Sequence, residues 1–184
     1  MAHDAAESNE TRDVKWLIAR EIPHLRRYAR ALVRDRDAAD DLVQDCLERA
    51  IRKRNQWRRD GTIRAWLFQM LYRTFLNGRR LRNREHAQIP IEDRNDGFHE
   101  RLRDPPRQEQ HVEWQDMAAA LDRLPDPQRA AVLLTALEGM SYDEVAGILR
   151  VPVGTVRSRL SRAREALRAT QIRRSAPVPL RRVK

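Results

Sequence analysis

The stretch Ser141–Ala169 reads SYDEVAGILRVPVGTVRSRLSRAREALRA and predicts two helices joined by a tight turn. Ser141 with Glu144 three residues later forms a capping-box pattern, so we expect the first helix to begin there. Pro152 should end it soon after, because proline has no amide N–H and restricts the residue before it. A second helix is expected from about Val153.

This second helix should have two different faces. One stripe is apolar and consists of Val156, Leu160, Ala163 and Leu167. The opposite stripe is polar and consists of Arg157, Ser158, Ser161 and Arg162. Residues 150–169 hold six arginines and one glutamate, so the outer face is basic. A solvated basic face is the alternative, but the turn and both faces together favour a helix-turn-helix that contacts DNA.

The sequence VPVGTVRSRLSRAREAL, residues 151–167, resembles the promoter-reading helix of bacterial RNA polymerase sigma factors of the extracytoplasmic function group. The resemblance implies that this helix enters the major groove of the upstream, minus-thirty-five, promoter element. The side chains expected to face the bases are Arg157, Ser158, Ser161 and Arg162. Those expected nearer to phosphate are Gly154, Thr155 and Arg159.

Composition limits the classes of protein that the chain can belong to. Its 37 Lys+Arg against 27 Asp+Glu give a net charge of +10, which favours a polyanionic partner such as nucleic acid. There is no run of apolar residues that would span a bilayer and no signal-peptide core, so we expect no membrane insertion. Cys46 is the single cysteine, which excludes a disulfide framework and a CxxC metal site. These features fit the cytoplasm, and six glycines with few β-branched runs favour an all-α fold.

The first half should form one helical domain over residues 13–84, after a disordered N-terminus at residues 1–12. We expect a short helix capped by Asp13 and a fresh helix with Pro23 in its first turn. Asp37 is expected to cap a longer helix. Cys46 lies in the apolar stripe of that helix and should be a buried side chain rather than a reactive thiol.

The outer face of this longer helix is acidic. It carries Asp41, Gln44, Asp45 and Glu48. The pattern alone leaves open whether this face is merely solvated or forms an interface. The sequence DAADDLVQDCLERA, residues 37–50, is similar to the sigma-factor segment that docks on the clamp coiled coil of core RNA polymerase. The resemblance therefore implies that these four residues bind polymerase.

A third helix should start near Ile63, with Trp66 in its core-facing stripe. One side is polar, and we expect the aromatic residues Phe68, Tyr72 and Phe75 at its flanks to share an exposed face that stacks on unpaired bases. The sequence GTIRAWLFQMLYRTFLNGRR, residues 61–80, resembles the sigma segment that captures the melted minus-ten strand. The contacts that this implies are Arg58, Gln69, Arg73, Asn77 and Arg80. The family often has asparagine where this chain has Arg73.

Residues 85–110 read as a linker, because they contain Pro105-Pro106 and show no sustained apolar period. The second domain should cover residues 111–170, with Asp126 as the cap of one helix and Gly139 as its C-terminal stop. Residues 171–184 should form a basic, disordered tail. The scattered histidines lack a metal-ligand spacing, so we expect no metal and no cofactor.

The sequence thus predicts two small helical domains joined by a flexible linker, the C-terminal one a helix-turn-helix. The resemblance implies an alternative sigma factor and not an enzyme: it would bind the clamp coiled coil and flap of core polymerase, recognise and melt promoter DNA, and serve stress-response genes under an anti-sigma factor. Two alternatives remain. One is a sigma-like decoy that sequesters an anti-sigma factor, and the other is a helix-turn-helix repressor, which leaves the face at residues 68–80 unexplained.

Overall fold

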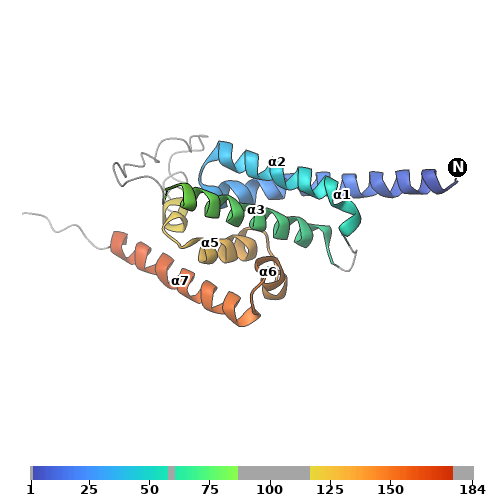
Figure 1. The fold of residues 1–184 in the computed structure, drawn as a ribbon. Helices are drawn as coiled ribbons and strands as arrows, with labels where there is room; N and C mark the ends of the chain where they lie inside the picture. The colour runs from blue at the N-terminus through green and yellow to red at the C-terminus, as the bar shows by residue number, and fades with distance from the viewer. Residues whose placement is uncertain (1, 58–60, 87–116, 176–184) are drawn as a thin grey trace, which may run out of the picture.

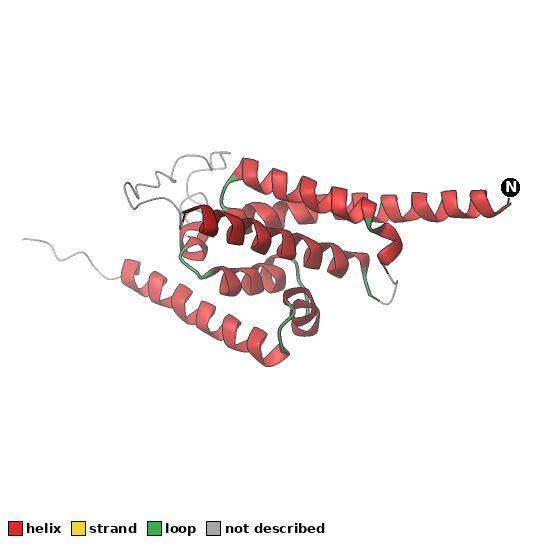
Figure 2. Cartoon of the chain, viewed as in Figure 1, coloured by secondary structure: helices red, strands yellow, loops and turns green. Residues whose placement is uncertain are grey.

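The computed structural model describes residues 2–57, 61–86 and 117–175, and Figure 2 shows that these residues form helices and short loops with no strand. The elements are α1 (Ala2–Val33), α2 (Arg36–Arg52), the 3-10 turn η1 (Arg54–Gln56), α3 (Ile63–His86), α5 (Asp126–Val132), the π turn η2 (Leu133–Leu137), α6 (Tyr142–Leu149) and α7 (Val153–Ser175). Residues 117–122 are also helical. The predicted all-α fold is confirmed. Residues 87–110 of the predicted linker, residues 176–184 of the predicted tail and Arg58 lie outside the described residues.

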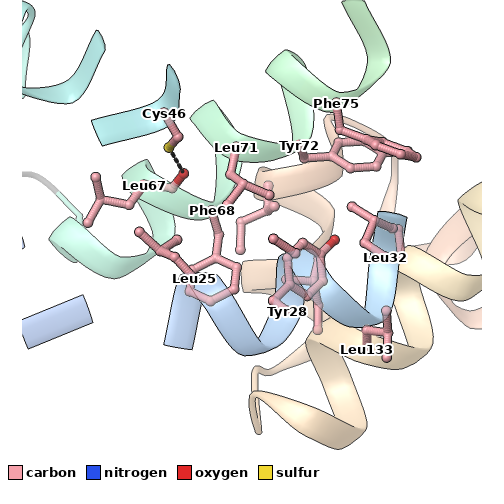
Figure 3. Close-up of a cluster of buried hydrophobic side chains, with 14 of the residues drawn as sticks. Leu25, Tyr28, Leu32, Cys46, Leu67, Phe68, Leu71, Tyr72, Phe75 and Leu133 are labelled. Atoms are coloured by element: carbon pink, nitrogen blue, oxygen red, sulfur yellow. Dashed lines mark hydrogen bonds between the residues drawn. The ribbon is translucent and has the colours of Figure 1, made fainter. Parts of the chain in front are cut away.

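The N-terminal half consists of α1, α2 and α3, which pack around one cluster of apolar side chains (Figure 3). Tyr28 of α1 meets Phe68 of α3 edge to face, with ring centroids 5.2 Å apart. Leu25 and Leu71 are fully buried beside them. Cys46 of α2 is also fully buried, as the sequence predicts. Burial of these large apolar side chains is the main term that stabilises the three-helix unit.

The C-terminal half consists of residues 117–122 and α5 to α7. Its buried side chains come from every helix of the half and include Ala130, Leu134, Val145, Ile148, Val156, Leu160 and Ala163. The apolar stripe that the sequence predicts for α7 is therefore buried at its first three positions, and Leu167 is half-buried.

The two halves pack against one another. In Figure 1, α3 lies between α2 on one side and α5 and α6 on the other. The buried cluster continues across this boundary, and Figure 3 shows Leu133 of η2 beside Tyr28 and Leu32 of α1. The C-terminal half therefore covers one face of α1 and α3, a packing that the sequence did not predict.

Helix α1 differs from the sequence-based expectation. It is one continuous helix that begins at Ala2 and contains Pro23, whereas we expected disorder at residues 1–12 and a fresh helix at Pro23. Val14 and Ile18 are buried in phase with Leu25 and Leu32, so one apolar stripe runs past the proline. Packing of this stripe outweighs the hydrogen bond that Pro23 removes, and a helix already formed extends towards Ala2 at little further cost.

Two predicted caps are also corrected. The N-cap of α2 is Asp35 and not Asp37, because the Asp35 carboxylate accepts a hydrogen bond from the Ala38 N–H at 2.8 Å. Asp126 is the first residue of α5 rather than its cap, a position taken by Pro125. The Asp126 carboxylate instead accepts from Arg129 Nη2 at 2.7 Å and pairs with Arg79 of α3.

Candidate nucleic-acid interface

The helix-turn-helix begins at a complete capping box. The Ser141 N–H donates to Glu144 Oε2 at 2.8 Å, and the Glu144 N–H donates to Ser141 Oγ at 3.3 Å. The backbone hydrogen bond from Ser141 holds the pKa of the Glu144 carboxyl below its usual value. The predicted start of this helix is confirmed, and the capping box provides acceptors for the Ser141 and Glu144 N–H groups.

The turn between α6 and α7 sets the direction of the second helix. Arg150 has φ +53°, a left-handed conformation that ends α6, and the Val151 N–H donates to the Ala146 carbonyl oxygen at 3.1 Å. The Thr155 N–H then donates to the Pro152 carbonyl oxygen at 2.8 Å. Val156 is fully buried and anchors the start of α7. The turn therefore orients α7 so that the face opposite Val156 points to solvent.

The outward face of α7 presents most of the residues predicted to contact the upstream element. Gly154, Arg157, Ser158, Ser161 and Arg162 are exposed, and Thr155 and Arg159 are half-buried. Within the described part of the chain, neither Arg157 nor Arg162 pairs with a carboxylate. The Ser158 hydroxyl donates to the Thr155 carbonyl oxygen at 3.0 Å. Two unpaired guanidinium groups on one rigid face can fork onto base edges or phosphates.

The polar residues of α3 share one side, as the helical spacing of Arg73, Asn77 and Arg80 predicts, and all three are exposed. Gln69 is half-buried, and its Nε2 donates to the Gly147 carbonyl oxygen of α6 at 3.0 Å. The structure thus brings three of the predicted minus-ten contacts together in the open and leaves the fourth engaged with the C-terminal half.

The aromatic part of this face is not exposed, so that prediction is wrong. Phe68, Tyr72 and Phe75 are 0%, 5% and 4% exposed. Tyr72 stacks on Phe75 at 6.2 Å between ring centroids, and burial raises the pKa of Tyr72, opposed by the charge of Arg159 on α7. Phe68 packs against Tyr28 inside the N-terminal core, and Tyr72 is buried near Arg159 of the C-terminal half. Trp66, expected in the core, is half-buried and packs against the apolar cluster.

The acidic face of α2 is exposed as predicted. Asp41, Gln44, Asp45 and Glu48 all face solvent, and Gln44 Nε2 donates to Glu48 Oε1 at 3.2 Å. Asp45 has a long ion pair with Arg49 at 3.9 Å, which is worth little at an exposed site.

A groove of about 510 Å³ opens beside this acidic face and was not predicted from the sequence. Its walls are Val33, Ala38, Asp41, Leu42, Gln44, Asp45, Thr74, Phe75 and Gly78. The small residues Ala38 on α2 and Gly78 on α3 were the available signal, because they leave room between two packed helices. The groove therefore combines apolar walls with the carboxylates of Asp41 and Asp45.

Among the described residues, no helix has the length and apolar content needed to cross a membrane. In the same part of the chain, no three or more histidines, cysteines and carboxylates gather where they could hold a metal ion.

Comparisons with known proteins agree with this geometry. Residues 18–72 match the family model described as the sigma2 domain of PhyR, and residues 114–167 match sigma-70 region 4. The ECF RNA polymerase sigma factor EcfG of Rhodopseudomonas palustris (strain TIE-1) is 38% identical over 80% of this chain and 79% of its own length. The ECF RNA polymerase sigma-E factor of Escherichia coli (strain K12) is 33% identical over 69% of this chain and 70% of its own.

Two solved structures resemble the whole arrangement. The sigma factor RpoE of Bartonella quintana, in complex with the anti-sigma factor NepR, has a TM-score of 0.73 at 33% identity, and the match covers 87% of this chain and 97% of that one. CnrH, in complex with the cytosolic domain of CnrY, has a TM-score of 0.66 at 28% identity, covering 95% and 96%.

Proposed function

Because the chain belongs to the extracytoplasmic function (ECF) group of RNA polymerase sigma factors, we propose that it binds core RNA polymerase and directs it to promoters. The observation that carries this proposal is the unpaired basic face of α7, held outward by the capping box and the left-handed turn. A sigma factor needs such a face in order to read duplex DNA.

In this proposal α7 enters the major groove of the upstream element. Arg157 and Arg162 fork onto guanine edges, and the hydroxyls of Ser158 and Ser161 reach neighbouring bases. Gly154, Thr155 and Arg159 contact phosphate at the start and side of the helix. The exposure of Arg157, Ser158, Ser161 and Arg162, and the burial of the opposite stripe of α7, support the assignment of the groove-facing side.

The N-terminal half holds the minus-ten element as a single strand. Arg73, Asn77 and Arg80 supply contacts along α3, and Arg58 and Gln69 are proposed to join them. Flipping a base out of the duplex costs a few kcal/mol, and contacts made only with the open strand offset that cost. Binding therefore drives melting, and the polymerase performs the chemistry.

Core polymerase is proposed to dock its clamp coiled coil on the acidic face of α2, and its flap on the C-terminal half. Asp41, Gln44, Asp45 and Glu48 provide acceptors for basic groups, and the adjoining groove provides apolar contact. An anti-sigma partner is supported by RpoE and CnrH, whose solved structures are complexes with NepR and with CnrY. Control of stress-response genes is proposed from the family resemblance.

A decoy function is the second candidate, because residues 18–72 match the sigma2 domain of PhyR, and PhyR is named as an anti-anti-sigma factor in a solved complex with the anti-sigma factor NepR. Run-off transcription separates the two. Purified core polymerase is mixed with the full chain and with promoter DNA, and the RNA products are sized. A sigma factor yields RNA from a defined start site; a decoy or a repressor yields none, and that result would contradict the proposal.

A further inference from the structure

A buried carboxylate lies at the boundary between the two halves. The side chain of Glu138, which follows η2, has no exposed surface. Its Oε1 accepts from Arg27 Nε at 3.0 Å, and its Oε2 accepts from Arg64 Nη2 at 2.6 Å and lies 3.1 Å from His24 Nδ1. All three partners belong to the N-terminal half. A single residue of the C-terminal half is therefore held by α1 and α3 together.

The same two arginines also bind the backbone at this point. Arg27 Nη2 donates to the Leu137 carbonyl oxygen, and Arg64 Nη2 to the Glu138 carbonyl oxygen, both at 3.0 Å. The π turn and Gly139, at φ +67°, end the helix here and leave its last carbonyl groups without helical partners. Arg27 and Arg64 thus donate hydrogen bonds to the end of the helix as well as to the Glu138 carboxylate.

The packing that this cluster holds conceals part of the proposed minus-ten surface. Gln69 is tied to the Gly147 carbonyl oxygen of α6, and the neighbouring Tyr72 is buried near Arg159 of α7. The outward residues of α7 remain exposed in the same arrangement. The packed arrangement, which we call the closed form, therefore restricts the strand-binding side and leaves the duplex-binding side free.

The closed form also buries polar groups that have no hydrogen-bond partner among the described residues and that would reach solvent if the two halves separated. Arg129 is 2% exposed, and its Nε and Nη1 have no hydrogen-bond partner in the described part of the chain. Burial lowers the pKa of Arg129 to about 10, with the charges of Arg34 and Arg79 acting in the same direction. The Tyr28 hydroxyl is buried and unpartnered as well. Unsatisfied buried donors destabilise the closed form, and the ionic contacts of Glu138 oppose this loss together with the apolar packing across the boundary.

We propose that Glu138 is a latch, and that its contacts with Arg27 and Arg64 hold the free protein in the closed form, which binds a single strand weakly because Gln69 is engaged with α6. Arg34, which contacts Asp122, and Arg79, which contacts Asp126, make a second set of ionic contacts across the same boundary. Opening of the latch exposes Gln69 and lets the two halves separate. This inference rests on the proposed function for its consequence, but the latch itself is a property of the free chain.

The test uses the full chain with one fluorophore on α2 and one on α7, attached at Arg52→Cys and Arg168→Cys. Both positions are exposed, and the native Cys46 is buried and does not compete for label. Energy transfer is measured without polymerase in the parent protein, in Glu138→Gln and in Arg27→Gln. Glu165→Gln is the matched control, because it removes one carboxylate from an exposed position of α7.

Glu138→Gln and Arg27→Gln should lower the energy transfer, and Glu165→Gln should not. Arg27 is half-exposed, so its variant keeps the test valid if Glu138→Gln fails to fold. Binding of a fluorescent single-stranded minus-ten oligonucleotide should tighten at least about tenfold in both latch variants, because loss of one partner breaks a buried ionic cluster. Unchanged energy transfer in both would overturn the latch.

The oligonucleotide and the transcription assay separate the two proposals. If energy transfer falls while strand affinity stays the same, and the parent protein still initiates RNA with polymerase, the latch does not inhibit and this inference is wrong. If energy transfer falls but the parent protein never initiates RNA, the latch stands and the proposed function fails.

Discussion

The Cys46 thiol donates to the carbonyl oxygen of Leu67 at 3.6 Å, which joins α2 to α3 in the middle of the N-terminal core. Burial raises the pKa of Cys46 to about 12 from 9.0, although the nearby Arg49 charge acts in the opposite direction. At pH 8 only the thiolate reacts, so a disulfide reagent should label the native chain about a thousandfold more slowly than the urea-unfolded chain. Equal labelling rates in both states would contradict this burial.

The raised pKa of Cys46 also determines how the free energy of unfolding changes with pH. Between pH 9 and 12 the native thiol keeps its proton while the unfolded thiol has lost it. The unfolded state then binds fewer protons, so this contribution to the free energy of unfolding is complete below pH 9 and decreases as the pH rises towards 12. Urea unfolding from pH 8 to 11 measures it, and Cys46→Ala should show a shallower decline than the parent.

Ser141→Ala should lower the free energy of unfolding by about 0.5–2 kcal/mol, because the first amide groups of α6 lose their cap. Urea unfolding followed by circular dichroism is the measurement. Ser161→Ala is the control: Ser161 is exposed in the middle of α7, where alanine is the better helix former, so stability should stay equal or rise slightly. Equal losses of unfolding free energy in both variants would mean that the capping box does not stabilise the protein.

Arg162→Ala should weaken binding of the polymerase complex to the upstream element by about 1–3 kcal/mol and relax base choice there. Arg164→Ala is the matched control, because Arg164 lies on the same helix but contacts the Tyr142 hydroxyl of α6 at 3.4 Å. Affinities for a panel of single-base promoter variants give the result. Promoter selectivity that survives Arg162→Ala unchanged would mean that another side of α7 faces the groove.

Asp41→Lys combined with Asp45→Lys should abolish binding of core polymerase while the fold stays intact, because both carboxylates are exposed and only Asp45 has a weak intrahelical pair. Co-elution with core polymerase on gel filtration reports binding, and circular dichroism reports folding. The control combines Asp13→Lys with Asp143→Lys, which changes net charge equally at exposed sites elsewhere. Full co-elution of the first pair would exclude this face as the docking site.

Local signals in the sequence predicted local structure well. The spacing of Ser141 and Glu144 predicted the capping box, and the position of Pro152 predicted the turn, because both depend on backbone groups within four residues. The prediction of Asp37 as the cap of α2 was wrong, because the cap is Asp35. Both can accept an amide hydrogen bond, and the left-handed turn at Arg34 that selects Asp35 leaves no mark in the sequence.

Packing between distant segments could not be predicted in this way. The pattern around Tyr72 is the same whether or not a second half covers it, so its burial near Arg159 of the C-terminal half was missed. Glu138 reads as a surface residue beside a helix stop, and only the approach of Arg27 and Arg64 from far along the chain makes a buried carboxylate favourable. The residues assigned to promoter and polymerase contact remain predictions.

We propose that two helical units of this sigma factor hold separate parts of one promoter. Site-specific photo-crosslinking tests it most directly, with a reactive group at residue 162 in one sample and at residue 77 in another, each assembled with core polymerase and promoter DNA. We predict that residue 162 crosslinks to the upstream duplex and that residue 77 crosslinks to the opened minus-ten strand. Crosslinks from residue 162 to no DNA, or from residue 77 only to closed duplex, would contradict it.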